Sequence, residues 1–162
     1  MAFSMSERME DRAVVSGNDA IAYMIFPDGR RKVLANMLSC DARQTYTKTK
    51  YPILGKRTKP AKKGQGEITG TMKLHYNTSV FREAALEYQK TGQDSFYDIQ
   101  LVNEDPNSGV GRQTVILYGL NFDEMPLALI DAEADYLTED LPFTANSWDL
   151  ENIFGDGGLI DA

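Results

Sequence analysis

The stretch that decides the fold is EITGTMKLHY, residues 67–76. Its side chains alternate strictly between two sets. The first set is apolar or small, and it comprises Ile68, Gly70, Met72, Leu74 and Tyr76; the second is polar or charged, and it comprises Glu67, Thr69, Thr71, Lys73 and His75. Successive side chains of a strand point to opposite faces of a sheet, so this pattern predicts a β-strand with one buried and one exposed face.

The only convincing helix follows directly, over residues 79–91. One apolar stripe at helical spacing is formed by Phe81, Ala84, Ala85 and Tyr88. Thr78 or Ser79 can cap the first amides, and Lys90 and Gly92 suit the end of the helix. We expect one face of this helix to pack on a sheet.

The rest of the chain is typical of strands joined by turns. We expect a hairpin over residues 20–38 with its turn at 27–30, and further strands at 41–50, 95–102, 112–122, 125–136 and 141–148. Strands and helices do not alternate, which argues against a parallel sheet. The predicted fold class is mainly β: an antiparallel β-sandwich or small barrel with one flanking α-helix. Its domain spans residues 16–150, between an N-terminal arm, 1–15, and a flexible acidic tail, 151–162.

Charge is distributed unevenly along a chain whose net charge is −7. This balance argues against a general nucleic-acid binder. Residues 42–66 contain no acidic residue, and residues 58–66, TKPAKKGQG, are expected to form a flexible basic loop. No basic residue follows Arg112. The two regions are either solvated surfaces or complementary contact faces.

Three carboxylates stand at spacing two in the strand expected over residues 125–136: Asp131, Glu133 and Asp135. Paired carboxylates can hydrolyse glycosides, but such pairs usually come from different elements within a cleft. Three acids on one strand face predict a flat acidic stripe, which favours a solvated face over a catalytic site.

Other candidates for chemistry are weak. The single histidine, His75, lies on the polar face of its strand, and the single cysteine, Cys40, allows no internal disulfide. Residues 105–111 faintly resemble a calcium loop, but Ile116 occupies the position where such a loop needs a glutamate. We expect no enzyme activity, cofactor or metal. Without a secretory signal or a membrane-length apolar run, we also expect a soluble protein kept in a cytoplasm.

Several segments together resemble one known family. They are GKRTKPAKKGQGEITGTM at 55–72, LHYNTSVF at 74–81, FYDIQL at 96–101, DPNSGVGRQTV at 105–115, LYGLNF at 117–122 and EDLPFT at 139–144. Their order and spacing resemble the PBSX-like tail tube proteins of contractile phages and phage-tail-like particles of Gram-positive bacteria. The likeness runs from about residue 14 to residue 149.

This resemblance implies a structural subunit that forms hexameric rings, stacked head-to-tail into the inner tube of a contractile tail. The tube would be a channel for DNA passage or membrane puncture, with DNA only transiently in the lumen. Implied partners are the tail sheath, tape measure, baseplate and tail terminator proteins, without a membrane anchor. Assembly would occur in the host bacterial cytoplasm, and the product would be a virion or a tail-like particle such as a bacteriocin. The alternatives are the tube of another contractile injection system and a monomeric ligand-binding β-sandwich.

Within that family, the two charged regions acquire specific roles. The candidate inter-ring contacts are Lys56, Arg57, Lys59, Lys62 and Lys63. The acidic stripe, Asp131, Glu133 and Asp135, is the candidate lumen-facing surface, because a basic wall would hold DNA whereas an acidic wall would let it slide. The competing interpretation places these acids on an outer or inter-ring surface, where they could meet the basic loop.

Overall fold

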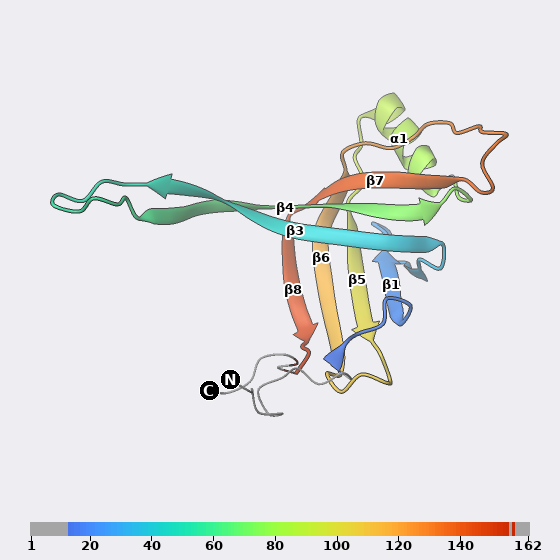
Figure 1. The fold of residues 1–162 in the computed structure, drawn as a ribbon. Coiled ribbons are helices and arrows are strands. Elements are labelled where there is room, and N and C mark those ends of the chain that lie inside the picture. The colour runs from blue at the N-terminus through green and yellow to red at the C-terminus, as the bar shows by residue number, and fades with distance from the viewer. Residues whose placement is uncertain (1–12, 156, 158–162) are drawn as a thin grey trace. The chain divides into compact units, whose positions relative to one another are not determined.

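A computed structural model describes residues 13–155 and 157, and the chain divides into two compact units. Unit 1 comprises the described residues 13–35, 96–119, 148–155 and 157, and unit 2 comprises residues 36–95 and 120–147. Over the described ranges the chain forms eight strands and one helix (Figure 1). The predicted fold class, mainly antiparallel β with one helix, is confirmed.

Unit 1 is built on β1 (Ala20–Ile25), β2 (Arg31–Val33), β5 (Tyr97–Glu104), most of β6 (Arg112–Phe122) and β8 (Ser147–Asn152). The strand order is β2-β1-β5-β6, and β8 pairs with β6. β1 is antiparallel to both of its neighbours. The buried apolar side chains are Ala22, Met24, Tyr97, Ile99, Val102, Ile116 and Leu117. The predicted first hairpin is correct in its turn but not in its length, since β2 ends at Val33.

Unit 2 contains β3 (Met37–Lys50), β4 (Ala61–His75), α1 (Val80–Thr91) and β7 (Thr138–Ala145). β4 lies between β3 and β7 and is antiparallel to both, and Asn121 and Phe122 at the end of β6 pair with the other side of β7. The buried apolar side chains are Ile68, Met72, Leu74, Phe81, Leu120, Leu141, Phe143 and Ala145. The alternation predicted for residues 67–76 is therefore confirmed, with Ile68, Met72 and Leu74 on the buried face.

The helix is also confirmed, although its apolar stripe is shorter than predicted. Phe81 is buried, and its ring meets that of Phe122 edge to face, with 5.0 Å between centroids. Gly92 adopts the left-handed conformation (φ 75°) and donates its N–H to the Tyr88 carbonyl, which ends the helix. Tyr88 is 54% exposed. The stripe ends early because residues 86–92, the end of the helix and its cap, are all exposed.

The flexible basic loop predicted over residues 58–66 is wrong from Ala61 onward. Residues 61–66 belong to β4 and pair with β3, in a register that puts Lys63 opposite Lys48 and Ala61 opposite Lys50. The glycines that indicated a loop have another function here. A Cβ on Gly64 would lie 2.8 Å from the Thr47 hydroxyl, so glycine lets the partner strand approach closely. The actual loop is residues 51–60.

The strand predicted over residues 125–136 is also wrong. Residues 123–137 form a loop between β6 and β7. The Asp131 carboxylate accepts the Glu133 N–H at 3.0 Å, a local turn that competes with strand pairing. The alternating Ala, Asp and Glu residues of this loop have the period of a strand, but these residue types are depleted in sheets. The acidic stripe on one strand face therefore does not exist.

The expected last strand, residues 141–148, is two strands, β7 and β8, separated at Asn146. Two residues assigned to the flexible acidic tail, Glu151 and Asn152, belong to β8. Residues 1–12 of the predicted N-terminal arm, and residues 156 and 158–162 of the predicted tail, lie outside the described residues.

The close packing around Gly70 gives a first test. A Cβ at Gly70 would lie 2.1 Å from the Asp41 carbonyl oxygen, 2.6 Å from the Phe143 ring and 2.9 Å from the Ala42 Cα. We expect Gly70→Ala to lower the free energy of unfolding by about 2 kcal/mol or more, because the backbone of β3 must move. Thermal unfolding measures the loss. Gly109→Ala is the matched control, since no atom lies within 4 Å of its added Cβ. Equal melting temperatures for the two variants would contradict this account of β3–β4–β7 packing.

Candidate assembly surfaces

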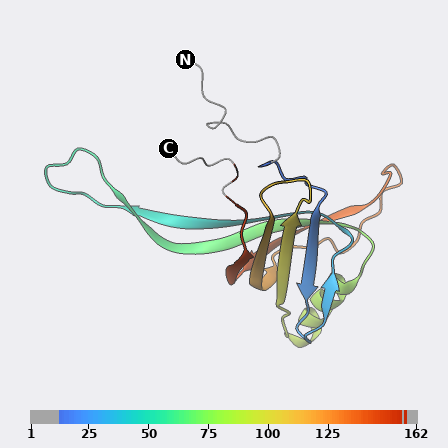
Figure 2. The same ribbon diagram turned by 90° about the horizontal axis from the view of Figure 1, so that it is seen from below.

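The first candidate surface is a two-stranded arm in unit 2. β7 pairs only with residues 68–75 of β4, whereas β3 pairs with β4 all the way from Leu74 to Ala61. Residues 61–67 therefore pair with β3 alone among the described strands. Seven strand residues span roughly 23 Å. The β3–β4 hairpin accordingly extends well beyond the end of β7 (Figures 1 and 2).

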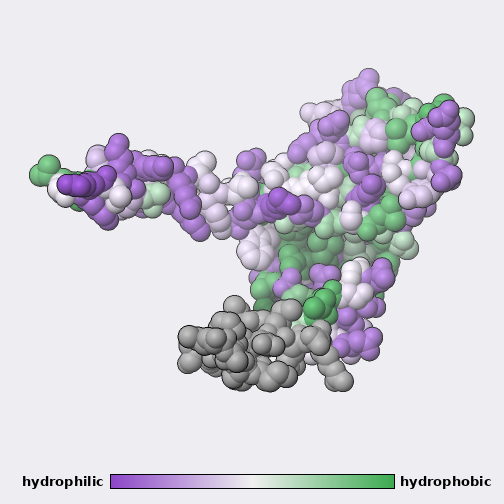
Figure 3. Space-filling model, viewed as in Figure 1, coloured by the Kyte–Doolittle hydropathy of each residue, from purple (hydrophilic) through white to green (hydrophobic). Residues whose placement is uncertain are grey.

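The tip of this arm, residues 51–60, combines exposed apolar side chains with positive charge. Tyr51, Ile53 and Leu54 are exposed, and Leu54 is fully exposed at 104%. Figure 3 shows a hydrophobic spot at the end of an otherwise hydrophilic arm. Of the five cations predicted as inter-ring contacts, Lys56, Arg57 and Lys59 lie in the tip, and Lys62 and Lys63 lie on the adjoining part of β4. All five are exposed, and the Lys63 ammonium lies 4.4 Å from the Tyr46 ring centroid.

The second candidate surface is the β6–β7 loop, residues 123–137, also in unit 2. Leu127 is 77% exposed and Ile130 is 97% exposed, and Tyr136 is exposed as well. The three predicted lumen residues, Asp131, Glu133 and Asp135, lie here with their side chains exposed. The three acids therefore lie together on a loop instead of a strand. The same loop carries the exposed aliphatic residues Leu127 and Ile130.

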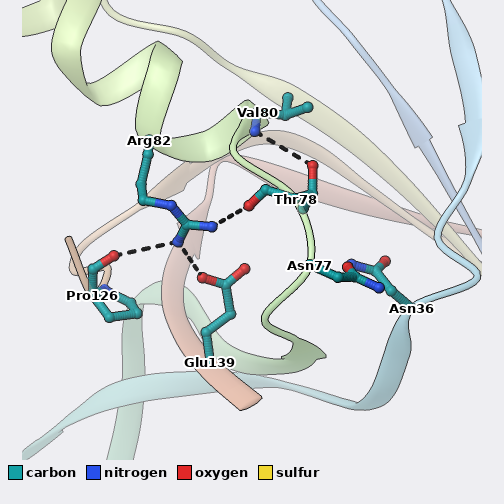
Figure 4. A network of polar contacts seen from close by, with 7 residues as sticks. All are labelled: Asn36, Asn77, Thr78, Val80, Arg82, Pro126 and Glu139. Carbon is teal, nitrogen blue, oxygen red and sulfur yellow. Dashed lines mark hydrogen bonds and ion pairs between the residues drawn. The ribbon is translucent and has the colours of Figure 1, made fainter. Parts of the chain in front are cut away.

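One end of this loop is fixed by a buried ion pair. The Arg82 guanidinium on α1 donates to the Glu139 carboxylate at 2.6 Å and to the Pro126 carbonyl at 3.4 Å, and it also donates to the Thr78 carbonyl (Figure 4). The guanidinium carbon lies 4.4 Å from the Tyr76 ring centroid. The Glu139 side chain is completely buried. Arg82 therefore joins the helix, β7 and the start of the loop.

Further contacts hold both ends of the loop. Asp123 donates its N–H to the Pro142 carbonyl at 2.8 Å, and its carboxylate accepts the Thr144 hydroxyl at 3.0 Å. At the other end, Tyr76 donates its N–H to the Leu137 carbonyl at 3.0 Å. The rings of His75 and Tyr136 meet at 5.8 Å between centroids. The loop consequently has fixed ends and an exposed middle.

Sequence reasoning missed the Arg82–Glu139 pair. A signal for the carboxylate was present: Glu139, Leu141 and Phe143 alternate along β7, and this spacing places Glu139 on the buried face. A charged side chain on a buried face needs an ionic or hydrogen-bonding partner. No local pattern identifies that partner as Arg82, which lies 57 residues away in the sequence.

The structure shows the surroundings of two groups that the sequence analysis considered for chemistry, Cys40 and residues 105–111. Burial, reinforced by the charge of Asp41, raises the pKa of the Cys40 thiol to about 12, so it stays protonated at neutral pH. The Asp105 carboxylate accepts the N–H groups of Ser16 and Asn107, and the Asp105 carbonyl accepts the Ser108 N–H at 3.0 Å, so a turn begins at Asp105. Within residues 13–155 and 157, no cluster of three or more His, Cys, Asp or Glu side chains could hold a metal ion. No helix in the same ranges is long and apolar enough to cross a membrane.

The chain is thus a mainly antiparallel β protein with one helix, and its unit 2 carries a long protruding hairpin and two exposed loops that combine charged and apolar side chains. A family model described as phage tail tube protein matches residues 7–151, so the chain belongs to the phage tail tube protein family. A relative in Bacillus subtilis (strain 168), the phage-like element PBSX protein XkdM, is 31% identical over 132 residues, which cover 82% of this chain and 88% of that protein. The resemblance drawn from the sequence is thereby confirmed.

Two solved structures share the fold at low sequence identity. One is the sheath-tube complex of an extracellular contractile injection system, PVC, in its extended state; the match covers 94% of this chain and 100% of that chain, with 15% identity and a TM-score of 0.63. The other is the baseplate of the anti-feeding prophage; the match covers 93% and 97% of the two chains, with 11% identity and a TM-score of 0.65.

The buried pair gives the second test. We expect Arg82→Met to lower the free energy of unfolding by about 3–5 kcal/mol, because it leaves the Glu139 carboxylate buried without its partner. The double variant, Arg82→Met with Glu139→Met, should recover much of that loss. Chemical denaturation of the variants measures both effects.

The control is Arg43→Met, because Arg43 pairs with Asp41 at 3.2 Å with both side chains exposed. Arg43→Met should lower the free energy of unfolding by less than about 1 kcal/mol. A double variant as unstable as the sum of its two single variants would show that Arg82 and Glu139 do not act as a pair.

Proposed function

We propose that six copies of this tail tube subunit form a ring, and that such rings stack into the inner tube of a contractile tail. The observation that carries this proposal is membership of the tail tube family over residues 7–151. The contractile character is supported by the fold shared with a chain of the sheath-tube complex of an extracellular contractile injection system. The tube serves as a channel for DNA passage or membrane puncture, and a structural role needs no catalytic residue.

The sheet edges favour assembly. β3 is an edge strand of 14 residues in unit 2, with β4 as its only partner among the described strands. Almost all of its side chains are exposed. Long open edges are a liability for a monomer because their backbone groups can pair with another chain. A ring of identical subunits offers every copy the same neighbour, so such an edge can be covered in each of them.

The partners follow from the same proposal. The subunit contacts further copies of itself, a surrounding sheath protein, and tape measure, baseplate and terminator proteins at the ends of the tube. DNA occupies the lumen only transiently if the particle is a phage. Assembly takes place in the host bacterial cytoplasm, and the product is a virion or a phage-tail-like particle. The tube of another contractile injection system is the related alternative.

The five candidate inter-ring cations keep their predicted role in this proposal. Lys56, Arg57, Lys59, Lys62 and Lys63 contact the neighbouring ring. For Asp131, Glu133 and Asp135 the sequence left the lumen wall and, as the competing position, an outer or inter-ring surface. An acidic wall does not hold DNA, whether its carboxylates come from a strand or from a loop. These three residues lie on a loop, so they form no continuous stripe along a strand.

Sizing and microscopy of the purified full chain test the proposal. We expect ring-shaped particles and rods of uniform width, on the order of 100 Å or less, as six small subunits would give. Negative-stain microscopy measures the width, and sedimentation measures the mass. The rival from another class, a monomeric ligand-binding β-sandwich, would instead stay near 18.1 kDa. A single monomeric species at high concentration, across several salt conditions, would contradict assembly.

A further inference from the structure

We infer that the arm tip of one copy, residues 51–60, binds the β6–β7 loop, residues 123–137, of a second copy. This inference rests on the proposed function and deepens it by naming both sides of one contact between subunits. It assigns the three acids of the loop to an intersubunit contact instead of the lumen wall.

The charges of the two surfaces are opposite and unmixed. The tip carries Lys56, Arg57 and Lys59, and no acidic residue occurs anywhere in residues 42–66. The loop carries Asp123, Glu124, Asp131, Glu133 and Asp135, and no basic residue follows Arg112. Each surface therefore repels its own kind and attracts the other. Such complementarity selects the partner and the orientation more than it adds affinity.

Each surface also presents aliphatic side chains amid its charges. Leu54 at the tip and Ile130 in the loop are almost wholly exposed, at 104% and 97%, and Leu127 is 77% exposed. One exposed leucine needs no explanation. Here, however, the three most exposed aliphatic side chains of the described residues lie on the two loops of opposite charge. An apolar centre with a charged rim is the usual anatomy of a protein interface.

The placement of the two surfaces requires a second copy. Both lie in unit 2, and they are at opposite ends of it in both ribbon views (Figures 1 and 2). One chain therefore cannot join its own tip to its own loop. A contact between two different patches is head-to-tail, and it can be repeated from copy to copy.

Both surfaces are held in place before they meet. The tip closes a hairpin whose strands pair as far as Lys50 and Ala61, and Tyr51 donates its N–H to the Pro60 carbonyl at 3.1 Å. The loop has fixed ends through Arg82, Asp123 and Tyr76. Prior ordering lowers the entropy that binding must offset. This favours a specific contact over two loops that remain free.

Cysteine cross-linking tests the pairing directly. The background is Cys40→Ser, which removes the native thiol. One chain then carries Leu54→Cys and a second carries Ile130→Cys, and the two are mixed under assembly conditions with a short bis-maleimide reagent. We expect covalent dimers in the mixture and little product from either chain alone. A chain with both substitutions should form a ladder of covalent multimers.

The matched control replaces Ile130→Cys with Leu86→Cys, since Leu86 is 49% exposed on α1 of the same unit. A mixture of Leu54→Cys and Leu86→Cys chains should give little product. Equal cross-linking in the control, or efficient dimers from Leu54→Cys alone, would contradict the inference. Rods without any Leu54–Ile130 product would overturn this contact while leaving the proposed function intact. Cross-linked multimers without rings would support the contact and overturn the hexameric tube.

Charge reversal gives an independent readout in the natural chain. Lys56→Glu with Lys59→Glu, or Asp131→Lys with Asp135→Lys, should raise the concentration needed for assembly roughly tenfold or more. A chain with all four substitutions should assemble nearly as well as the original, because the signs match again. If Asp131→Asn, Glu133→Gln and Asp135→Asn together leave stacking and its salt dependence unchanged, the acids are not in the contact and the inference is overturned, which leaves the lumen wall and the outer surface as their positions.

Discussion

The structure of unit 2 depends on the two-sided pairing of β4. Along residues 68–75 this strand lies between β3 and β7 and buries Met72 and Leu74 completely, whereas along residues 61–67 it pairs with β3 alone. Its first half is therefore part of an exposed arm and its second half is part of a core. Gly70 stands in the closely packed half, where the Asp41 carbonyl and the Phe143 ring leave no room for a side chain. One continuous strand thus joins the arm to the core, although the β3–β4 register shifts between Tyr46 and Lys48.

The same unit also fixes its second exposed surface. Glu139 on β7 is buried with Arg82 of α1, and Arg82 in turn binds the carbonyl of Pro126 at the start of the β6–β7 loop. A buried pair of this kind is weak support for stability in general, but it can specify a unique arrangement. Here it fixes the position from which the exposed segment departs. The charges and aliphatic side chains of the arm tip and of the loop are thus displayed by an ordered framework.

Much of the fold could be predicted from the sequence, because a half-buried strand and an amphipathic helix carry their own periodicity. Ile68, Met72 and Leu74 are buried as predicted, as is Phe81. The errors arose where local composition and long-range pairing disagree. Residues 61–66 look like a loop, yet β3 recruits them into a strand, and residues 125–136 have the period of a strand but form a loop. The basic and acidic candidate residues could be found from the composition of the sequence. Only the structure shows that they share exposed loops with Leu54, Leu127 and Ile130.

The central claim is that this tail tube subunit is joined to further copies of itself through its arm. Helical reconstruction by electron microscopy of the rods formed by the unmodified chain tests it most directly. The account predicts rings of six subunits in which every arm tip, residues 51–60, lies against residues 123–137 of another copy. Rings of another number, or arm tips that end in solvent or in the lumen without touching a second copy, would contradict it.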